Sequence, residues 1–204
     1  MSTDVQTKRL NDPRAERSRT ALLRATFVLL KSEADLPDLT VAKIVREAGV
    51  TRPTFYQHFA SVSQLVNAAL ISRLQEVLDR IQREAPNLPL PARMKWTLRC
   101  LIGHLYAERI YAKVLRTLAA PEILAELVTF VAARLGSEQL FLSEDSQNHP
   151  YPKQFAEFLA AGAIWLVWEW LIAPTDSVED VTERVTTSLL VGMGGMPQSE
   201  GGVR

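Results

Sequence analysis

The stretch GVTRPTFYQHF, residues 49–59, concentrates polar and aromatic side chains that could contact a large polar partner. Arg52, Thr54, Gln57 and His58 can all donate hydrogen bonds, and none of them is acidic. A short helix that presents these side chains on one face could meet the base edges and phosphates of nucleic acid. A buried core segment and a catalytic cluster are the alternatives, and the surrounding elements help to decide among the three.

Two short helices joined by a tight turn are predicted around this stretch. Thr40 is a good N-cap for the helix VAKIVREA, residues 41–48, and Gly49 suits the left-handed residue that ends it. Thr51 can cap the next helix, which places Pro53 in its first turn, where a missing N–H costs little. The apolar residues expected to pack between the two helices are Ile44, Val45, Ala48, Val50 and Phe55. This arrangement is typical of a helix-turn-helix unit.

The charge of the chain is unevenly distributed. The formal net charge is zero, but seven of the residues from 8 to 31 are basic and two are acidic. An anionic partner feels this local basicity, which the average over the chain hides. The same residues could equally form a solvated helix face, so charge by itself leaves both interpretations open.

Composition indicates a soluble cytoplasmic protein. Hydrophobic residues make up 47% of the chain, enough for a globular core, and the single cysteine excludes a disulfide within it. The N-terminus is polar, without the apolar stretch of a signal peptide. The longest apolar run, 158–173, has about 16 residues, fewer than the ~20 needed to cross a bilayer. We therefore expect no membrane partner.

The apolar residues recur at helical spacing along the chain, and alternating strand patterns are absent. We predict an all-α protein of about nine helices, with a three-helix helix-turn-helix domain at its N-terminus and a larger helical domain after it. The predicted parts are a flexible arm (1–12), the helix-turn-helix domain (13–60), the larger domain (61–193) and a disordered tail (194–204). The helices expected in the larger domain lie near 61–85, 91–107, 108–119, 121–141, 151–173 and 177–193.

Residues 17–66 resemble the DNA-binding domain of the tetracycline-repressor (TetR/AcrR) family. The similar segments are LLRATFVLL, LTVAKIVREAGVTRPTFYQHF and ASVSQL. The resemblance implies a homodimer that binds palindromic operator DNA through its N-terminal domains. It also implies a C-terminal domain that dimerises and holds a small-molecule effector, without a cofactor. The function that it implies is a ligand-responsive transcriptional regulator, a repressor in its simplest form.

The resemblance also implies roles for individual residues. Thr40 and Lys43 would contact backbone phosphates, and Tyr56 and His58 would reach others. Gln57 could contact either a base or a phosphate. The residues expected deepest in the major groove are Thr51, Arg52, Pro53 and Thr54, with Arg52 the best candidate for a guanine contact.

Four positions near this surface need separate interpretation. Phe55 and Phe59 are expected in the core, and Tyr56 could be partly packed because tyrosine has an apolar body and a polar tip. Val62 stands where the family commonly has a lysine that meets a phosphate. Each lost phosphate contact lowers the salt dependence of DNA binding by roughly one unit, unless the basic first helix or Lys43 compensates.

The C-terminal segments ERIYAKVLRTL and AAGAIWLVWEWL are similar to parts of the family's larger domain. The resemblance implies that helices 151–173 and 177–193 form a four-helix bundle with those of a second subunit. The candidate effector-pocket residues are Trp96, Cys100, His104, Tyr106, Trp165 and Trp168. An ordinary core is the alternative for each aromatic residue of this set.

Other functions have less support. Cys100, His104 and Glu108 recur every four residues, but without a second histidine this pattern predicts no metal site. An enzyme is not indicated, because no nucleophile–histidine–acid spacing is present and the three histidines are far apart. The remaining alternative is a DNA-binding or partner-binding protein of the same fold without a small-molecule effector.

Overall fold

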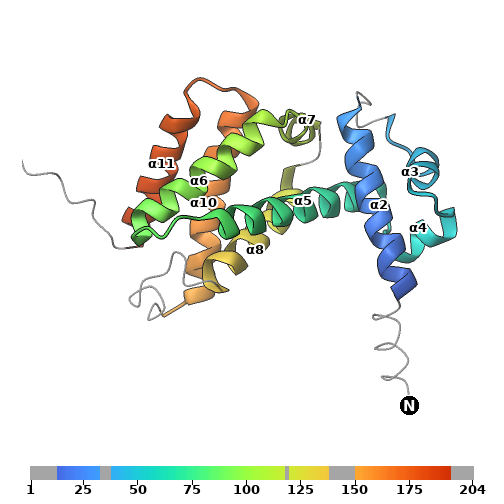
Figure 1. Cartoon of the computed structure of the whole chain (residues 1–204), viewed down its shortest axis with the longest axis horizontal. Coiled ribbons are helices and arrows are strands. Elements are labelled where there is room, and N and C mark those ends of the chain that lie inside the picture. The colour runs from blue at the N-terminus through green and yellow to red at the C-terminus, as the bar shows by residue number, and fades with distance from the viewer. Residues whose placement is uncertain (1–12, 33–37, 118–119, 138–149, 194–204) are drawn as a thin grey trace, which may run out of the picture. The chain divides into compact units, whose positions relative to one another are not determined.

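The computed structural model describes residues 13–32, 38–117, 120–137 and 150–193. Within these ranges the chain forms nine α-helices and no β-strand, which confirms the predicted all-α class (Figure 1). The predicted arm, 1–12, and the predicted tail, 194–204, lie outside the described residues.

The chain divides into two compact units, residues 1–74 and residues 75–204. Helix α5 (Val62–Glu84) passes through this division as one helix of 23 residues. The first half of α5 belongs to the first unit because it contributes buried residues such as Leu65 and Leu70 to that unit. The division therefore falls inside α5, whereas the domain boundary predicted between residues 60 and 61 lies just before it.

In the first unit, α2 (Pro13–Lys31) packs against α3 (Val41–Ala48) and α4 (Arg52–His58), as Figure 1 shows. The largest fully buried side chains of this unit are Leu22, Ile44, Phe55, Leu65 and Val66. They come from α2, α3, α4 and α5, so the two short helices rest on a core to which both longer helices contribute. Burying a side chain of this size favours folding by about 1.5–3 kcal/mol.

The helices of the second unit are α6 (Leu90–Ala107), α7 (Ile110–Thr117), α8 (Ala120–Ser137), α10 (Pro152–Ile172) and α11 (Val178–Gly192). The central helix is α10, which packs against α8, α11, α7 and α6, while α11 also packs against α6. Buried residues of this core include Met94, Ile102, Leu159, Val181 and Val185. The five helices match the predicted ones, although the predicted ends at 119 and 141 fall outside the described residues.

Helix α10 is apolar on most of its surface. By length and composition it could cross a membrane, and it meets this criterion alone among the described helices. The sequence estimate of about 16 residues counted the apolar run 158–173, whereas the helix begins earlier, at Pro152, and has 21 residues. A core helix of a soluble protein satisfies the same criterion, and α10 packs against four helices of its own unit.

Candidate nucleic-acid interface

The turn between α3 and α4 depends on Gly49. Its φ is 65°, in the left-handed region that glycine adopts without the penalty of a Cβ atom. The amide of Val50 donates to the carbonyl oxygen of Val45 at 3.0 Å, and that of Gly49 donates to Arg46 at 3.3 Å. These bonds satisfy carbonyl groups at the end of α3 and confirm the predicted end of that helix.

The start of α4 is fixed by a side-chain cap. The Thr51 hydroxyl oxygen accepts from the backbone N–H of Thr54 at 3.3 Å, and the two hydroxyl groups lie 2.9 Å apart. Pro53 lies in the first turn, where its missing N–H leaves no helical bond unmade. The predicted cap and the predicted position of the proline are thus confirmed, and both give α4 a defined direction.

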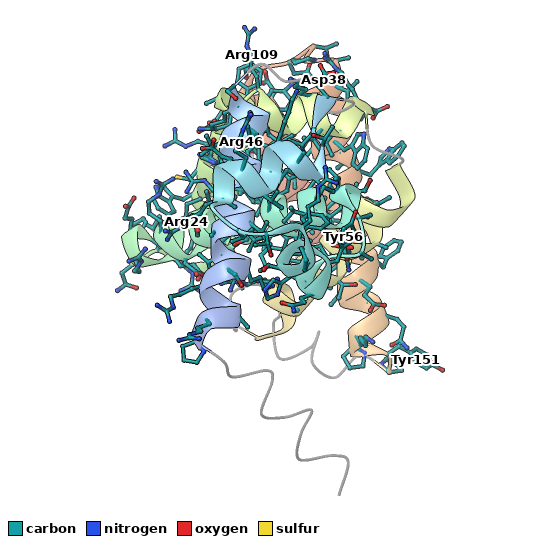
Figure 2. The ribbon with its side chains drawn as sticks, turned by 90° about the vertical axis from the view of Figure 1, so that its right-hand side faces the viewer. Arg24, Asp38, Arg46, Tyr56, Arg109 and Tyr151 are labelled. Carbon is teal, nitrogen blue, oxygen red and sulfur yellow. The ribbon has the colours of Figure 1, made fainter. Side chains whose placement is uncertain are left out.

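Helix α4 has a buried face and an exposed face. Phe55 is fully buried and Phe59 is nearly so, which confirms that both belong to the core. Tyr56, which is labelled in Figure 2, is 61% exposed. Its ring and that of Phe55 are nonetheless in an edge-to-face arrangement, with a centroid distance of 5.1 Å. Arg52 and Gln57 are also exposed. The residues that could reach a partner are therefore separated from those that hold the helix in place.

His58 occupies a position between these two faces. It is half-buried, and its Nε2 atom lies 2.8 Å from Oγ of Ser18 in α2. The Ser18 hydroxyl also lies within hydrogen-bond distance of the carbonyl oxygen of Ala15, at 2.9 Å, and the tautomer of His58 sets which side chain of the Ser18–His58 pair donates. The Nδ1 atom is then the ring nitrogen left for any further partner. Ser18 has no local sequence signal, because its partner lies 40 positions away.

The starts of α3 and α5 flank α4 along the chain. Thr40 caps α3 by accepting from the backbone N–H of Lys43 at 3.3 Å, and both residues are exposed. At α5, the Ser61 hydroxyl accepts from the N–H of Gln64 at 3.1 Å, while Val62 is half-buried. The first residue of α5 therefore brings no charge to the surface, and any electrostatic contribution here must come from other elements.

The basic residues of α2 have different environments. Arg14, Arg17 and Arg24 are exposed, and Figure 2 shows Arg24 projecting from α2. The guanidinium of Arg19 lies 5.8 Å from the centre of the Phe59 ring, and the Lys31 ammonium lies 5.3 Å from that of Phe27. The latter two cations thus also contact aromatic rings of their own unit, so the basic stretch is partly structural.

Comparison with known proteins identifies the family. A sequence model of the family described as "Bacterial regulatory proteins, tetR family" matches residues 22–69, the segment that contains the core half of α2, all of α3 and α4, and the start of α5. The chain belongs to the TetR family. The resemblance to the TetR family that the sequence suggested is thus confirmed for the residues that form the helix-turn-helix unit.

Two curated relatives of this TetR-family protein are described as uncharacterised HTH-type transcriptional regulators. YxbF of Bacillus subtilis (strain 168) is 24% identical over 157 residues, which is 76% of this chain and 40% of the relative. A regulator of Haemophilus influenzae (strain ATCC 51907 / DSM 11121 / KW20 / Rd) is 30% identical over 70 residues, 34% of each protein. The alignments thus span less than half the length of either relative.

Solved structures show the same fold at low sequence identity. The dihydroxyacetone kinase operon activator DhaS is 15% identical, has a TM-score of 0.53, and is matched over 87% of this chain and 96% of its own. The fatty acid degradation regulator FadR from Bacillus halodurans is 15% identical, with a TM-score of 0.50 and coverage of 91% and 99%. These likenesses show a common fold, and they cover the larger helical part as well as the helix-turn-helix unit.

The six candidate effector residues do not share one environment. Trp96, Cys100 and His104 are half-buried and lie four residues apart, on one face of α6. Tyr106 is 51% exposed and Trp165 is 57% exposed. Trp168, by contrast, is buried in α10. The structure thus places three of the six together on α6, and the assignment of all six to a pocket stays a prediction.

Neighbouring aromatic residues that the sequence did not single out lie beside this set. The Tyr106 ring lies 5.0 Å from that of Trp170, and the His104 ring lies 6.0 Å from that of Tyr111. Burial raises the pKa of the Cys100 thiol, which disfavours the thiolate that a metal would require. Among the described residues, no group of three histidine, cysteine, aspartate or glutamate side chains could hold a metal ion.

Proposed function

We propose that this TetR-family protein is a cytoplasmic transcriptional repressor that binds palindromic operator DNA as a homodimer. The observation that supports the proposal most directly is that α4 has a buried face and an exposed face. Phe55 and Phe59 are buried, whereas Arg52, Tyr56 and Gln57 are exposed. A short helix anchored on one face and rich in donors on the other can enter a major groove. Both curated relatives are named as transcriptional regulators, which supports this assignment.

The roles proposed for individual residues follow their positions. The exposed side chains of Thr40 and Lys43, at the start of α3, would contact phosphates. Arg52 would read a guanine through two hydrogen bonds, and Tyr56 would reach the DNA backbone. His58 would contribute through Nδ1, because Nε2 is already engaged with Ser18. The residues proposed to lie nearest the bases remain Thr51, Arg52, Pro53 and Thr54, with Gln57 beside them.

A second copy of the chain is the partner proposed for α10. Phe158 is 72% exposed and Trp165 is 57% exposed, and with the exposed Gly162 they follow one another at helical spacing. A contiguous apolar stripe of this kind marks an interaction surface. A two-fold axis would place the same stripe of α10 and the neighbouring α11 of each copy against its counterpart. The α4 helices of the two copies would then be about one DNA turn apart, ~34–36 Å.

Effector control is proposed to act through α5. An apolar or aromatic small molecule in the second unit, near Trp96, Cys100 and His104, would release the operator if it binds the DNA-free state more tightly. The continuity of α5 through both units supports this route, because a displacement of one half of a helix is carried to the other.

Two findings favour a second candidate function, in which the protein regulates transcription without such an effector. Tyr106 and Trp165 are both more than half exposed, so they do not form part of an enclosed site in one chain. In that case the exposed aromatic residues would serve assembly or partner binding. Screening small aromatic compounds by thermal shift separates the two functions: effector control requires a compound that raises Tm and lowers operator affinity.

The proposed function is tested by footprinting the DNA upstream of the protein's own gene. We expect two protected half-sites related by a two-fold axis, about one helical turn apart. A reporter driven by that DNA should be expressed more strongly without the protein than with it. Absence of any protected site, or a protected site without two-fold symmetry, would contradict a dimeric operator-binding protein.

A further inference from the structure

A hollow on the first unit lies outside the exposed face of α4. Its lining consists of Arg14, Arg17, Ser18 and Ala21 from α2, and Val50 from the turn between α3 and α4. It has a volume of about 370 Å³ and is open to solvent. All five residues belong to one compact unit, so the hollow is a property of that unit alone.

The chemistry of the lining favours an anion. Two of the five residues are arginines, and none of the five is acidic. Nε of Arg17 donates to the carbonyl oxygen of Pro13 at 2.9 Å, which holds the guanidinium against the first turn of α2. A guanidinium has five donors in a planar fork, so this bond leaves the Arg17 Nη groups to bind the oxygens of a phosphate. Ala21 and Val50 are the apolar residues of the lining.

The hollow is next to the elements that position α4. Val50 directly precedes Thr51, the residue that caps α4. Ser18 lines the hollow and also forms a hydrogen bond with His58 at the other end of α4. An anion held in the hollow would therefore lie beside the helix that carries Arg52 and Tyr56.

We propose that the hollow binds a phosphodiester group of the DNA strand that flanks the groove entered by α4. The inference rests on the proposed function and extends it, because it adds a backbone contact on α2 to those of α3 and α4. The two arginines clamp one phosphate through charge-assisted hydrogen bonds. Such a contact sets the position of the protein along the DNA and does not read sequence.

The test needs no knowledge of the operator, because a phosphate contact is independent of sequence. Binding of the full-length protein to a fluorescent duplex of about 30 mixed-sequence base pairs is measured by anisotropy over a series of salt concentrations. The variants are Arg14→Gln/Arg17→Gln and, as a matched control, Arg24→Gln. Arg24 is an exposed arginine of the same helix that is not part of the lining.

We expect the double variant to lower the slope of log K against log salt by about 0.9, because it removes the contact with one phosphate. Arg24→Gln should leave the slope within about half a unit of the wild-type value. Arg14→Lys/Arg17→Lys should restore the slope, because the charges return, but should bind more weakly because lysine cannot form the planar fork.

Three outcomes are informative. A wild-type slope in Arg14→Gln/Arg17→Gln overturns the phosphate site while leaving the proposed function intact. An equal loss of slope in Arg24→Gln also overturns it, because general charge on α2 would then explain the effect. Failure of the wild-type protein to bind the duplex even at low salt overturns the proposed function and with it the partner assigned to the hollow.

Discussion

Nε2 of His58 lies 2.8 Å from Oγ of Ser18, so a side-chain hydrogen bond joins α4 to α2 across 40 positions of sequence. His58 is in the last turn of α4 and Ser18 is in the N-terminal half of α2. Helix α4 has seven residues, too few to be stable by itself, and its orientation depends on such contacts. The pair therefore links the position of the proposed DNA-binding face to the core of its unit.

Loss of this hydrogen bond should weaken DNA binding. Ser18→Ala removes a bond of about 1 kcal/mol, and we expect operator affinity to fall about fivefold through poorer positioning of α4. Ser18→Thr keeps the hydroxyl and should bind within about twofold of the wild type. Ser32→Ala is the matched control, because the Ser32 hydroxyl donates to the carbonyl oxygen of Leu29, three residues earlier, at 3.2 Å. Equal affinities of Ser18→Ala and Ser32→Ala would show that the pair has no positioning role.

The conformation of Gly49 should make it sensitive to any side chain. A Cβ atom at Gly49 would meet no atom within 4 Å, so the cost of Gly49→Ala comes from the left-handed backbone. We expect a loss of about 1 kcal/mol in the free energy of unfolding. Gly103→Ala is the contrasting control, because Gly103 lies within α6 and its added Cβ would make an ordinary 3.9 Å contact with Val178. There alanine should be neutral or stabilising, by up to about 1 kcal/mol. Urea unfolding curves measure both changes. A Gly49→Ala variant as stable as the wild type, or a Gly103→Ala variant that loses as much stability as Gly49→Ala, would contradict the explanation.

The exposed stripe on α10 should control assembly. Phe158→Glu/Trp165→Glu places two carboxylates in the proposed two-fold interface, where each would face its own counterpart and repel it. We expect this variant to sediment as a monomer while the wild type sediments as a dimer. Val28→Glu is the control, since Val28 is an exposed apolar residue of α2. A double variant that remains dimeric would show that another surface joins the subunits.

The start of α11 should give a small acid-dependent contribution to stability. Hydrogen bonds from the side chain and the backbone of Ser177 lower the pKa of the Asp180 carboxyl below its ordinary value of 3.8. Because the folded-state pKa is lowered, the stabilisation is present above pH 3.8 and is lost as pH falls through the lowered pKa. Asp180→Asn should therefore have a lower Tm than the wild type near neutral pH. The difference should narrow as pH is reduced below 3.8, and a constant difference would show that the charge is not responsible.

Local chemistry explains why much of the helix-turn-helix unit could be predicted. The caps at Thr40 and Thr51 and the left-handed Gly49 are each determined by residues within a few positions, so their sequence signals were sufficient. The burial of Phe55 and Phe59 followed from helical spacing in the same way.

Contacts between distant segments could not be predicted by the same means. How the helices pack determines the hydrogen bond between Ser18 and His58. It also determines the hollow that Val50 and residues of α2 line together. No short sequence pattern encodes this packing. The same holds for α10, where the sequence could not show that Trp168 would be buried and Trp165 exposed, three residues apart. Whether the candidate effector residues converge likewise depends on packing, and the structure unites only Trp96, Cys100 and His104 on one helix face.

The central claim, that the exposed face of α4 binds operator DNA, is tested most directly by Arg52→Ala and Tyr56→Ala. Both residues are exposed, so neither change should alter Tm or the mass of the dimer. Affinity for the DNA upstream of the gene, measured by anisotropy, should fall at least about tenfold in each variant. Arg52→Ala should also reduce the preference for that DNA over a mixed-sequence duplex, because a base contact accounts for about 1–3 kcal/mol of discrimination. Wild-type affinity in both variants, with fold and dimer intact, would contradict the account.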